Sequence, residues 1–311
     1  MIDAASGHLR WLRDQWRIGA SRPGRRESGA VVIMLFHGLF RNSREVRSGV
    51  CDPQQGITIG FFTEFVESLL AHGVAIRRLE DALQGPQDGA TAVITFDDGY
   101  VSNALALQVL EQFEVPATFY ISTNHVAEQK SFWWDVMYRE SARRGAAPAA
   151  IRRQIRSLKQ LRAEEIEARL IQWFGSRALL PMSDCDRPFT RAELAEFAKS
   201  PHVSLGNHTA DHAILVNYDP AGIRNEIDLA QQFLTGVSGV TPKSIAYPNG
   251  GYDARVLEIA CGAGLEFGLT VRTGLNTSPS SHPMELHRVT VWGVPGAQRQ
   301  ARVLASTMRR S

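Results

Sequence analysis

The chain has 311 residues, of which 44% are hydrophobic and 21% are charged, and its formal net charge is +2. This composition supports one large or two ordinary globular domains with a substantial core, and the balanced charge argues against a nucleic-acid partner. The three cysteines are far apart and offer neither a disulfide framework nor the paired spacing of a cysteine zinc site. A reducing compartment is the simplest interpretation.

The first 29 residues form a basic and aromatic extension. Tryptophans and leucines alternate with arginines from Leu9 to Arg17, and an Arg/Pro/Gly stretch follows at 22–26. The segment has no apolar core typical of a secretory signal, and no run in the chain approaches the roughly 20 apolar residues of a membrane span. We expect a short helix docked on the fold, with an interfacial membrane helix as the alternative. We therefore expect a cytoplasmic protein, with peripheral contact to the inner membrane through Trp11 and Trp16 left open.

Apolar runs of strand length alternate with helical patterns along the body of the chain. We predict strands at 31–36, 74–76, 92–96, 117–121, 203–205, 244–246, 267–271 and 286–291, and helices at 61–70, 101–113, 190–199, 223–234, 253–261 and 297–309, with a helical turn at 79–83. This alternation predicts an α/β protein with a largely parallel sheet or barrel.

The region from about 131 to 186 has a different character. Phe132, Trp133 and Trp134 open a helical stretch, and residues 151–173 combine many charges with apolar residues at helical spacing. We interpret this region as a helical insertion on the rim of the fold, whose charge run is a solvated face.

The predicted strand at 92–96 ends in two adjacent carboxylates, Asp97 and Asp98, followed by Gly99. In parallel α/β folds the functional groups collect at the carboxyl ends of strands. Two neighbouring carboxylates stay ionised together only beside a cation, typically a metal or an arginine. Taken alone, Asp98-Gly99 could equally be a turn.

Two histidines, His208 and His212, follow the predicted strand at 203–205 and stand four residues apart. In a helical turn both imidazoles would project from one face, about 5–6 Å apart, and could share a metal ion. Such pairs are commonly surface residues. Their position at the same edge of the sheet as Asp98 favours a catalytic metal site, in which one carboxylate and two imidazoles leave a coordination position open for water.

The two motifs Thr95-Phe96-Asp97-Asp98-Gly99-Tyr100 and His208-Thr209-Ala210-Asp211-His212 together resemble those of the polysaccharide deacetylases with nodulation-protein-B homology, carbohydrate esterase family four. The resemblance implies a distorted (β/α)7-type barrel over residues 30–296, interrupted by the helical insertion at about 131–186 and followed by a C-terminal helix at 297–311. It also implies one divalent metal, usually zinc, and hydrolysis of N-acetyl groups on an amino sugar in a glycan or glycan precursor.

Carried over to this chain, the resemblance makes Asp97 the general base and Asp98, His208 and His212 the metal ligands. The family's third motif matches Tyr247-Pro248-Asn249-Gly250, so the backbone N–H of Asn249 is expected to stabilise the oxyanion. The residues expected to contact the sugar are Tyr247, His37 and Trp134, although aromatic residues that open a helix are more often part of a core.

The chain departs from the family at Ala246, where an arginine normally steadies the catalytic aspartate. We expect Arg288 to hold Asp97 instead, with Arg272 as the competing residue. His287 matches the family histidine that protonates the leaving amine. Because neighbouring strand residues point to opposite faces, Arg288 and His287 cannot both face the site.

Two other functions stay open at this point. One is an amidase that acts on a formyl, ureido or cyclic imide group, and the other is a catalytically inactive carbohydrate-binding protein. The intact set of Asp97, Asp98, His208 and His212 argues against the second, because a binding module needs no base beside a metal site. The sequence does not identify the sugar or the oligomeric state.

Overall fold

The computed structural model describes residues 30–84, 89–277 and 281–309. The predicted basic and aromatic extension at 1–29, with its expected membrane contact, lies outside the described residues. Within them, one parallel sheet has the order β7-β6-β5-β4-β3-β1-β8, with β2 paired to β3. Its strands are β1 (Val31–Phe36), β2 (Ala75–Ile76), β3 (Thr91–Phe96), β4 (Ala117–Ile121), β5 (Val203–Asn207), β6 (Ser244–Ala246), β7 (Phe267–Leu269) and β8 (Val289–Thr290).

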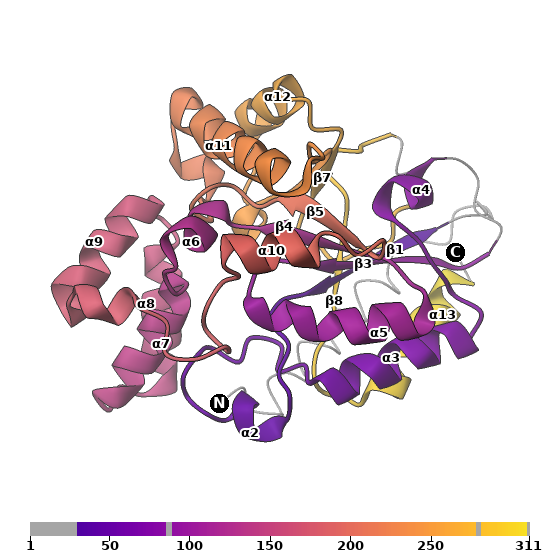
Figure 1. The fold of residues 1–311 in the computed structure, drawn as a ribbon, viewed down its shortest axis with the longest axis horizontal. Coiled ribbons are helices and arrows are strands. Elements are labelled where there is room, and N and C mark those ends of the chain that lie inside the picture. The colour runs from indigo at the N-terminus through magenta and orange to yellow at the C-terminus, as the bar shows by residue number, and fades with distance from the viewer. Residues whose placement is uncertain (1–29, 85–88, 278–280, 310–311) are drawn as a thin grey trace.

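Helices surround this sheet (Figure 1). They are α2 (Ser43–Val46), α3 (Ile59–Ala71), α4 (Leu79–Leu83), α5 (Leu105–Phe113), α6 (Thr123–Glu128), α7 (Trp133–Arg143), α8 (Pro148–Leu158), α9 (Ala163–Phe174), α10 (Arg191–Phe197), α11 (Pro220–Ser238), α12 (Ala254–Gly262) and α13 (Ala297–Met308). Short 3₁₀ turns lie at Val101–Ala104, Ser176–Leu179, Leu215–Asn217 and Pro248–Gly250. The sequence pattern did not predict the short helices α2 and α6.

The sheet curls into a partly closed barrel, which confirms the predicted fold class. The N–H of Leu286 donates to the carbonyl of Gly268 in β7 at 2.8 Å, while β8 pairs with β1. The segment from Leu286 to Thr290 thereby connects the two ends of the sheet. β8 is shorter than the predicted strand at 286–291, because residues 286–288 pair with the chain around β7 before the segment reaches β1.

Alternating side chains of β1 supply the two layers of the core. Val31 and Ile33 pack inside the barrel, whereas Val32, Met34 and Phe36 pack outward. The outer cluster includes residues of α3, α5 and α13, which lie along one flank of the sheet in Figure 1. Burial on both faces explains why this strand is an uninterrupted apolar run in the sequence.

The region between β4 and β5 adds α7, α8 and α9, which lie together at one side of the sheet in Figure 1. These helices share their own apolar cluster, which includes Val136, Leu158 and Leu170. A buried ion pair joins Arg139 to Asp186 at 2.6 Å, and the hydroxyl of Ser131 donates to the same carboxylate at 3.0 Å. The two ends of this region are therefore held side by side.

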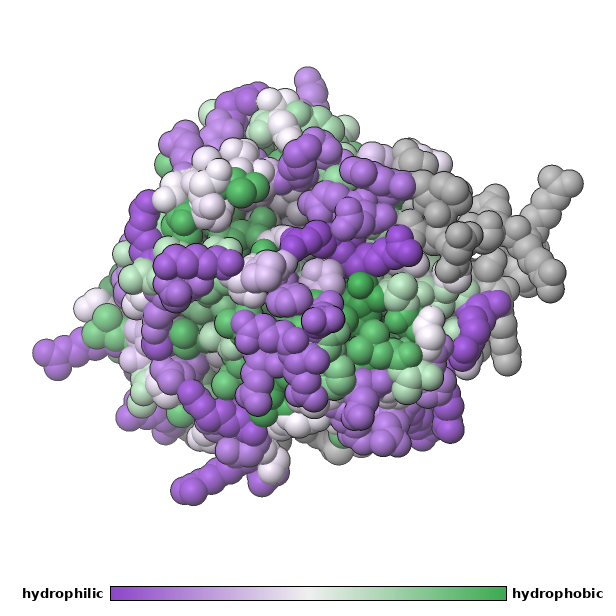
Figure 2. Space-filling view, turned by 45° about the vertical axis from the view of Figure 1, so that its right-hand side comes forward, coloured by the Kyte–Doolittle hydropathy of each residue, from purple (hydrophilic) through white to green (hydrophobic). Residues whose placement is uncertain are grey.

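The face drawn in Figure 2 is covered mainly by hydrophilic side chains, with smaller areas of hydrophobic side chains between them. Among the described residues, no helix combines the length and the apolar character that crossing a membrane would require.

Candidate active site

Asp97 and Asp98 lie directly after β3, in a sharp turn. The N–H of Asp97 still bonds to the carbonyl of Phe36 in β1, but Asp98 has a φ of 79° and Gly99 a φ of 91°. A Cβ on Gly99 would come within 3.1 Å of the Ile121 side chain, so glycine suits this position on two grounds. Left-handed backbone at Asp98 costs energy and is typical of functional sites, where the surrounding structure maintains it.

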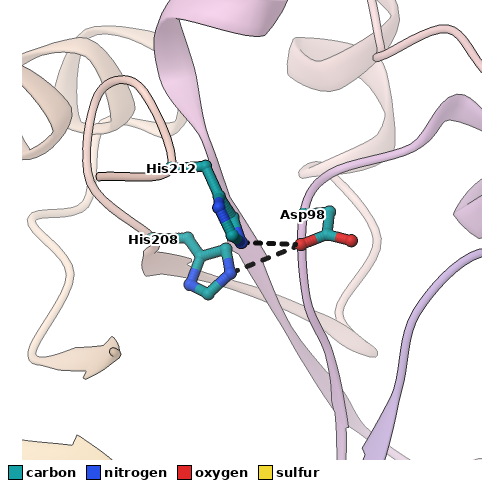
Figure 3. Close-up of side chains that lie close together, drawn as sticks. All are labelled: Asp98, His208 and His212. Atoms are coloured by element: carbon teal, nitrogen blue, oxygen red, sulfur yellow. Dashed lines mark ion pairs between the residues drawn. The ribbon is translucent and has the colours of Figure 1, made fainter. Parts of the chain in front are cut away.

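His208 and His212 lie in a loop after β5, so the predicted helical turn is wrong. Thr209 and His212 have φ values of 61° and 51°, which a right-handed helix excludes. Side chains hold this loop instead: the Asn207 amide oxygen accepts from the N–H of Thr209, and the Thr209 hydroxyl accepts from the N–H of Ala213, both at 2.8 Å. The tight loop still points both imidazoles at one oxygen of Asp98 (Figure 3).

The geometry of this trio fits a tetrahedral metal site. The Nε2 atoms of His208 and His212 each lie 3.4 Å from Oδ1 of Asp98. Ligand atoms about 2.0–2.1 Å from zinc at tetrahedral angles would be about 3.4 Å apart. Nδ1 of His208 lies 2.7 Å from the carbonyl of Ala246, which holds the proton on Nδ1 and leaves the lone pair of Nε2 for a metal.

Asp97 does not belong to that trio, because Arg288 holds it in a two-pronged ion pair. Nη1 and Nη2 of Arg288 donate to Oδ1 and Oδ2 of Asp97, each at 2.7 Å, and both side chains are buried. The expected contact is thus present. Burial acts to raise the pKa of Asp97, but the Arg288 charge and the neighbouring His208 outweigh it, so the pKa lies below its ordinary value. Asp97 is therefore a carboxylate at neutral pH.

Two expected site residues lie elsewhere. The ring of His287 packs on Gly274, and its backbone N–H donates to the side chain of Asn276, so His287 does not line the site cavity. The strand register that turns Arg288 inward turns His287 away. Tyr247 is fully buried with its hydroxyl donating to the carbonyl of Met284 at 3.0 Å, which makes it a core residue and corrects its expected contact with sugar.

A cavity of about 1000 Å³ opens over the carboxylates and histidines. His37, Trp134 and Asn249 line it. His37 Nδ1 lies 3.0 Å from the Gln55 amide oxygen, and Asn249 has a left-handed φ of 56°. Trp134 is only 8% exposed, and its ring centroid lies 4.5 Å from that of His212, so Trp134 chiefly supports that histidine.

Hydrogen bonds connect the turn after β3 to the first helix of the insertion. Nε1 of Trp134 donates to the hydroxyl of Tyr100 at 2.8 Å, and this hydroxyl donates to Asp135 at 2.8 Å. Nε2 of Gln54 approaches Oδ2 of Asp98 at 3.3 Å. The insertion therefore forms part of the site wall, and Gln54 is a site residue that carried no signal in the sequence.

The insertion's charge run is mostly exposed, as a solvated face would be, but part of it also lines the cavity. Arg152, Arg156 and Lys159 of the α8 region line the cavity together with Ile151 and Ile155. Their spacing of four and three residues is the signal that could have identified them, since it places all three on one side of a helix.

The comparisons with known proteins agree with this architecture. A family model for polysaccharide deacetylase matches residues 84–268, whereas the search of curated proteins finds no match. Among solved structures, the Streptococcus pyogenes deacetylase PplD in complex with acetate is 16% identical with a TM-score of 0.63, over 89% of this chain and 99% of that one. IcaB from Ammonifex degensii is 17% identical with a TM-score of 0.59, over 91% of this chain and 98% of that one.

A third structure, the BpsB deacetylase domain from Bordetella bronchiseptica, is 18% identical with a TM-score of 0.57, over 84% of this chain and 96% of that one. At these identities the structural likeness concerns the fold. The family model covers more than half of the chain, including both motifs that follow β3 and β5. The chain therefore belongs to the polysaccharide deacetylase family, whose reaction is the hydrolysis of an amide.

Proposed function

We propose that this protein is a metal-dependent hydrolase that removes N-acetyl groups from an amino sugar in a glycan or glycan precursor. One observation carries the proposal. In a single cavity, a metal-donor trio of Asp98, His208 and His212 lies beside a separate carboxylate, Asp97, that Arg288 keeps ionised and oriented.

The donor set suits a borderline metal such as zinc, because it combines two imidazoles with one carboxylate. A bound divalent metal would supply Lewis acidity, which polarises the amide carbonyl and lowers the pKa of water. Asp97 accepts the proton of the attacking water. Its two contacts with Arg288 leave each carboxylate oxygen a further lone pair, which can point into the cavity.

Hydrolysis then breaks the C–N bond and releases acetate and the free amine. The carbonyl oxygen gains negative charge on the way, and we assign its stabilisation to the backbone N–H of Asn249. The leaving nitrogen must gain a proton. Among the described histidines, His37 is the one outside the donor trio that lines the cavity, so we assign this proton donation to His37 rather than to His287.

The test measures metal content and product release on the full chain. Purified protein should contain about one divalent metal per chain and should release acetate from N-acetylated amino sugars. Asp97→Asn should keep the metal and lose about 10²–10⁴-fold in turnover, as expected for a general base. His287→Ala, which changes a residue outside the cavity, is the matched control and should remain active.

A panel of N-formyl sugars, offered beside the N-acetyl sugars, distinguishes deacetylation from the hydrolysis of another amide. Release of formate but not acetate would refute deacetylation and would make the protein an amidase of another kind. Full activity of Asp97→Asn would refute the assigned base.

A further inference from the structure

The α8 region contributes a row of basic side chains to the wall of the cavity. We propose that the acetylated amino sugar carries a phosphate, and that Arg152, Arg156 and Lys159 bind this phosphate. The proposal rests on the proposed function and names the chemical class of its substrate.

The three residues form one continuous row. They are separated by four and three positions, so their side chains lie on one face of the helical segment, which extends about 10 Å from the first to the last. Nζ of Lys159 lies 2.5 Å from Oδ1 of Asn249. Lys159 therefore lies beside the loop assigned to oxyanion binding, and Arg156 and Arg152 follow on the same face of the helical segment.

The arginines of this row lack the carboxylate partners that some other basic residues of residues 130–186 have. Lys130 pairs with Glu167 at 2.7 Å and Arg143 with Glu140 at 3.3 Å. Within residues 30–84, 89–277 and 281–309, no carboxylate pairs with the side chain of Arg152 or Arg156. Two cations that line a cavity without counter-ions favour an anionic ligand there.

Lys159 adds to the excess of positive charge on this wall of the cavity. Burial lowers the pKa of Lys159 and the charge of Arg156 acts in the same direction, although Asp52 and Asp98 oppose both. A doubly negative group next to Lys159 would stabilise the ammonium form and offset the cost of burying it.

The acidic residues that line the cavity, Asp52, Asp97 and Asp98, are each engaged by other groups. The carboxylate of Asp52 accepts from the backbone N–H of Gln54 at 3.0 Å. Both oxygens of Asp97 are bound by Arg288, and Asp98 faces the two imidazoles. Arginine forks bind the oxygens of phosphate in pairs, and lysine adds a compact charge. A row of three cations therefore suits a ligand with a phosphate ester better than a ligand with a single carboxylate. Nucleoside-diphosphate sugars and lipid-linked sugars share this chemistry.

The same helix provides an internal control. Arg153 is exposed like Arg152 and Arg156 but does not line the cavity. Ile151 and Ile155, which share the inner face, do line it. Arg152 thus lies on the cavity face of α8 and its neighbour Arg153 on the solvent face, so a variant of each can be compared.

The first experiment measures binding of inorganic phosphate to the metal-loaded full chain by calorimetry. Arg152→Gln combined with Arg156→Gln should weaken binding at least about tenfold, and Arg153→Gln should bind like the wild type. Equal affinity in all three proteins would mean that phosphate binds only at the metal and would overturn the proposal. Absence of binding to the wild type at millimolar phosphate would also overturn it.

The second experiment compares turnover of N-acetylglucosamine 1-phosphate with that of methyl N-acetylglucosaminide. The phosphorylated sugar should have the lower KM, and the double variant should lose this advantage with little change in kcat. Preference for the neutral sugar in the wild type would overturn the proposal. If neither sugar releases acetate, the proposed deacetylation fails for both sugars. Phosphate binding by the α8 variants still tests whether Arg152 and Arg156 bind phosphate.

A third comparison identifies the source of the phosphate. A uridine diphosphate sugar and a lipid phosphate sugar in detergent micelles can be offered in competition. Lower KM for the first assigns a soluble nucleotide precursor, and lower KM for the second assigns a lipid-linked one. Either result supports recognition of phosphate, provided that the advantage disappears in the double variant and persists in Arg153→Gln.

Discussion

Replacement of Arg288 by lysine tests whether orientation of Asp97, and not charge alone, is required for turnover. In the wild type the guanidinium donates to Oδ1 and Oδ2 of Asp97 at 2.7 Å each and to the carbonyl of Thr270 at 2.8 Å. A lysine keeps the positive charge, but its single nitrogen cannot reach both carboxylate oxygens in parallel while it also satisfies Thr270.

The structure sets the size of the expected effect. Arg288→Lys loses at least one charge-assisted bond, worth roughly 1.5–3 kcal/mol, and leaves the buried carbonyl of Thr270 short of a donor. The free energy of unfolding should fall by about 2–4 kcal/mol. A carboxylate that is free to rotate is a misplaced base, for which a loss of about 100-fold in kcat is expected.

The assay combines acetate release, metal content and urea unfolding. Arg272→Lys is the matched control, because the Arg272 side chain is 63% exposed and its contact with the carboxylate of Glu285 is 3.8 Å long. We expect unchanged metal content in both variants and a loss of turnover in Arg288→Lys alone. Wild-type kcat in a folded Arg288→Lys protein would refute the orienting role of Arg288.

Three further predictions concern the metal donors, the turn after β3 and a buried acid. Alanine at any one of Asp98, His208 or His212 should abolish stoichiometric metal binding, measured by elemental analysis; full occupancy in such a variant would remove that residue from the donor set. Gly99→Ala should destabilise the fold by about 1–3 kcal/mol in urea unfolding, because it adds a Cβ at a φ of 91° and 3.1 Å from Ile121. Burial and the adjacent Asp211 raise the pKa of Glu226 from 4.5 to about 7. Between these two pH values the folded protein holds a proton on Glu226 that the unfolded chain has lost, so the free energy of unfolding falls as the pH rises from about 4.5 to about 7. Glu226→Gln should therefore be more stable than the wild type by up to about 3 kcal/mol at pH 8 and by little at pH 4. The same difference between the two proteins at both pH values would contradict the raised pKa of Glu226.

Much of the site could be predicted from the chain because its residues follow strands directly. The carboxyl ends of parallel strands meet at one edge, so Asp98 after β3 and His208 after β5 were expected to approach each other. The contact of Arg288 with Asp97 followed from the same logic, since the last segment closes the sheet beside β1 and β3.

The remaining features depend on contacts between distant segments. The register of the segment before β8 is set by its bonds to Gly268 and Arg272, and local sequence cannot decide between Arg288 and His287. The loop with His212 follows non-helical backbone that the side chains of Asn207 and Thr209 stabilise, which a four-residue spacing does not reveal. The cavity face of α8 is defined only once the insertion packs against the barrel.

Arg139, Asp186 and Ser131 close the two ends of the insertion in one buried cluster. Because its two ends are held together at a buried ion pair, the helices between them can differ in length or composition without a change in the register of β4 and β5. Asp97, Asp98, His208 and His212 belong to the barrel, whereas α8 belongs to the insertion. Exchange of α8 and α9 between relatives of this fold, with Trp134 and Asp135 retained because they contact His212 and Tyr100, would test whether the choice of substrate moves with α8.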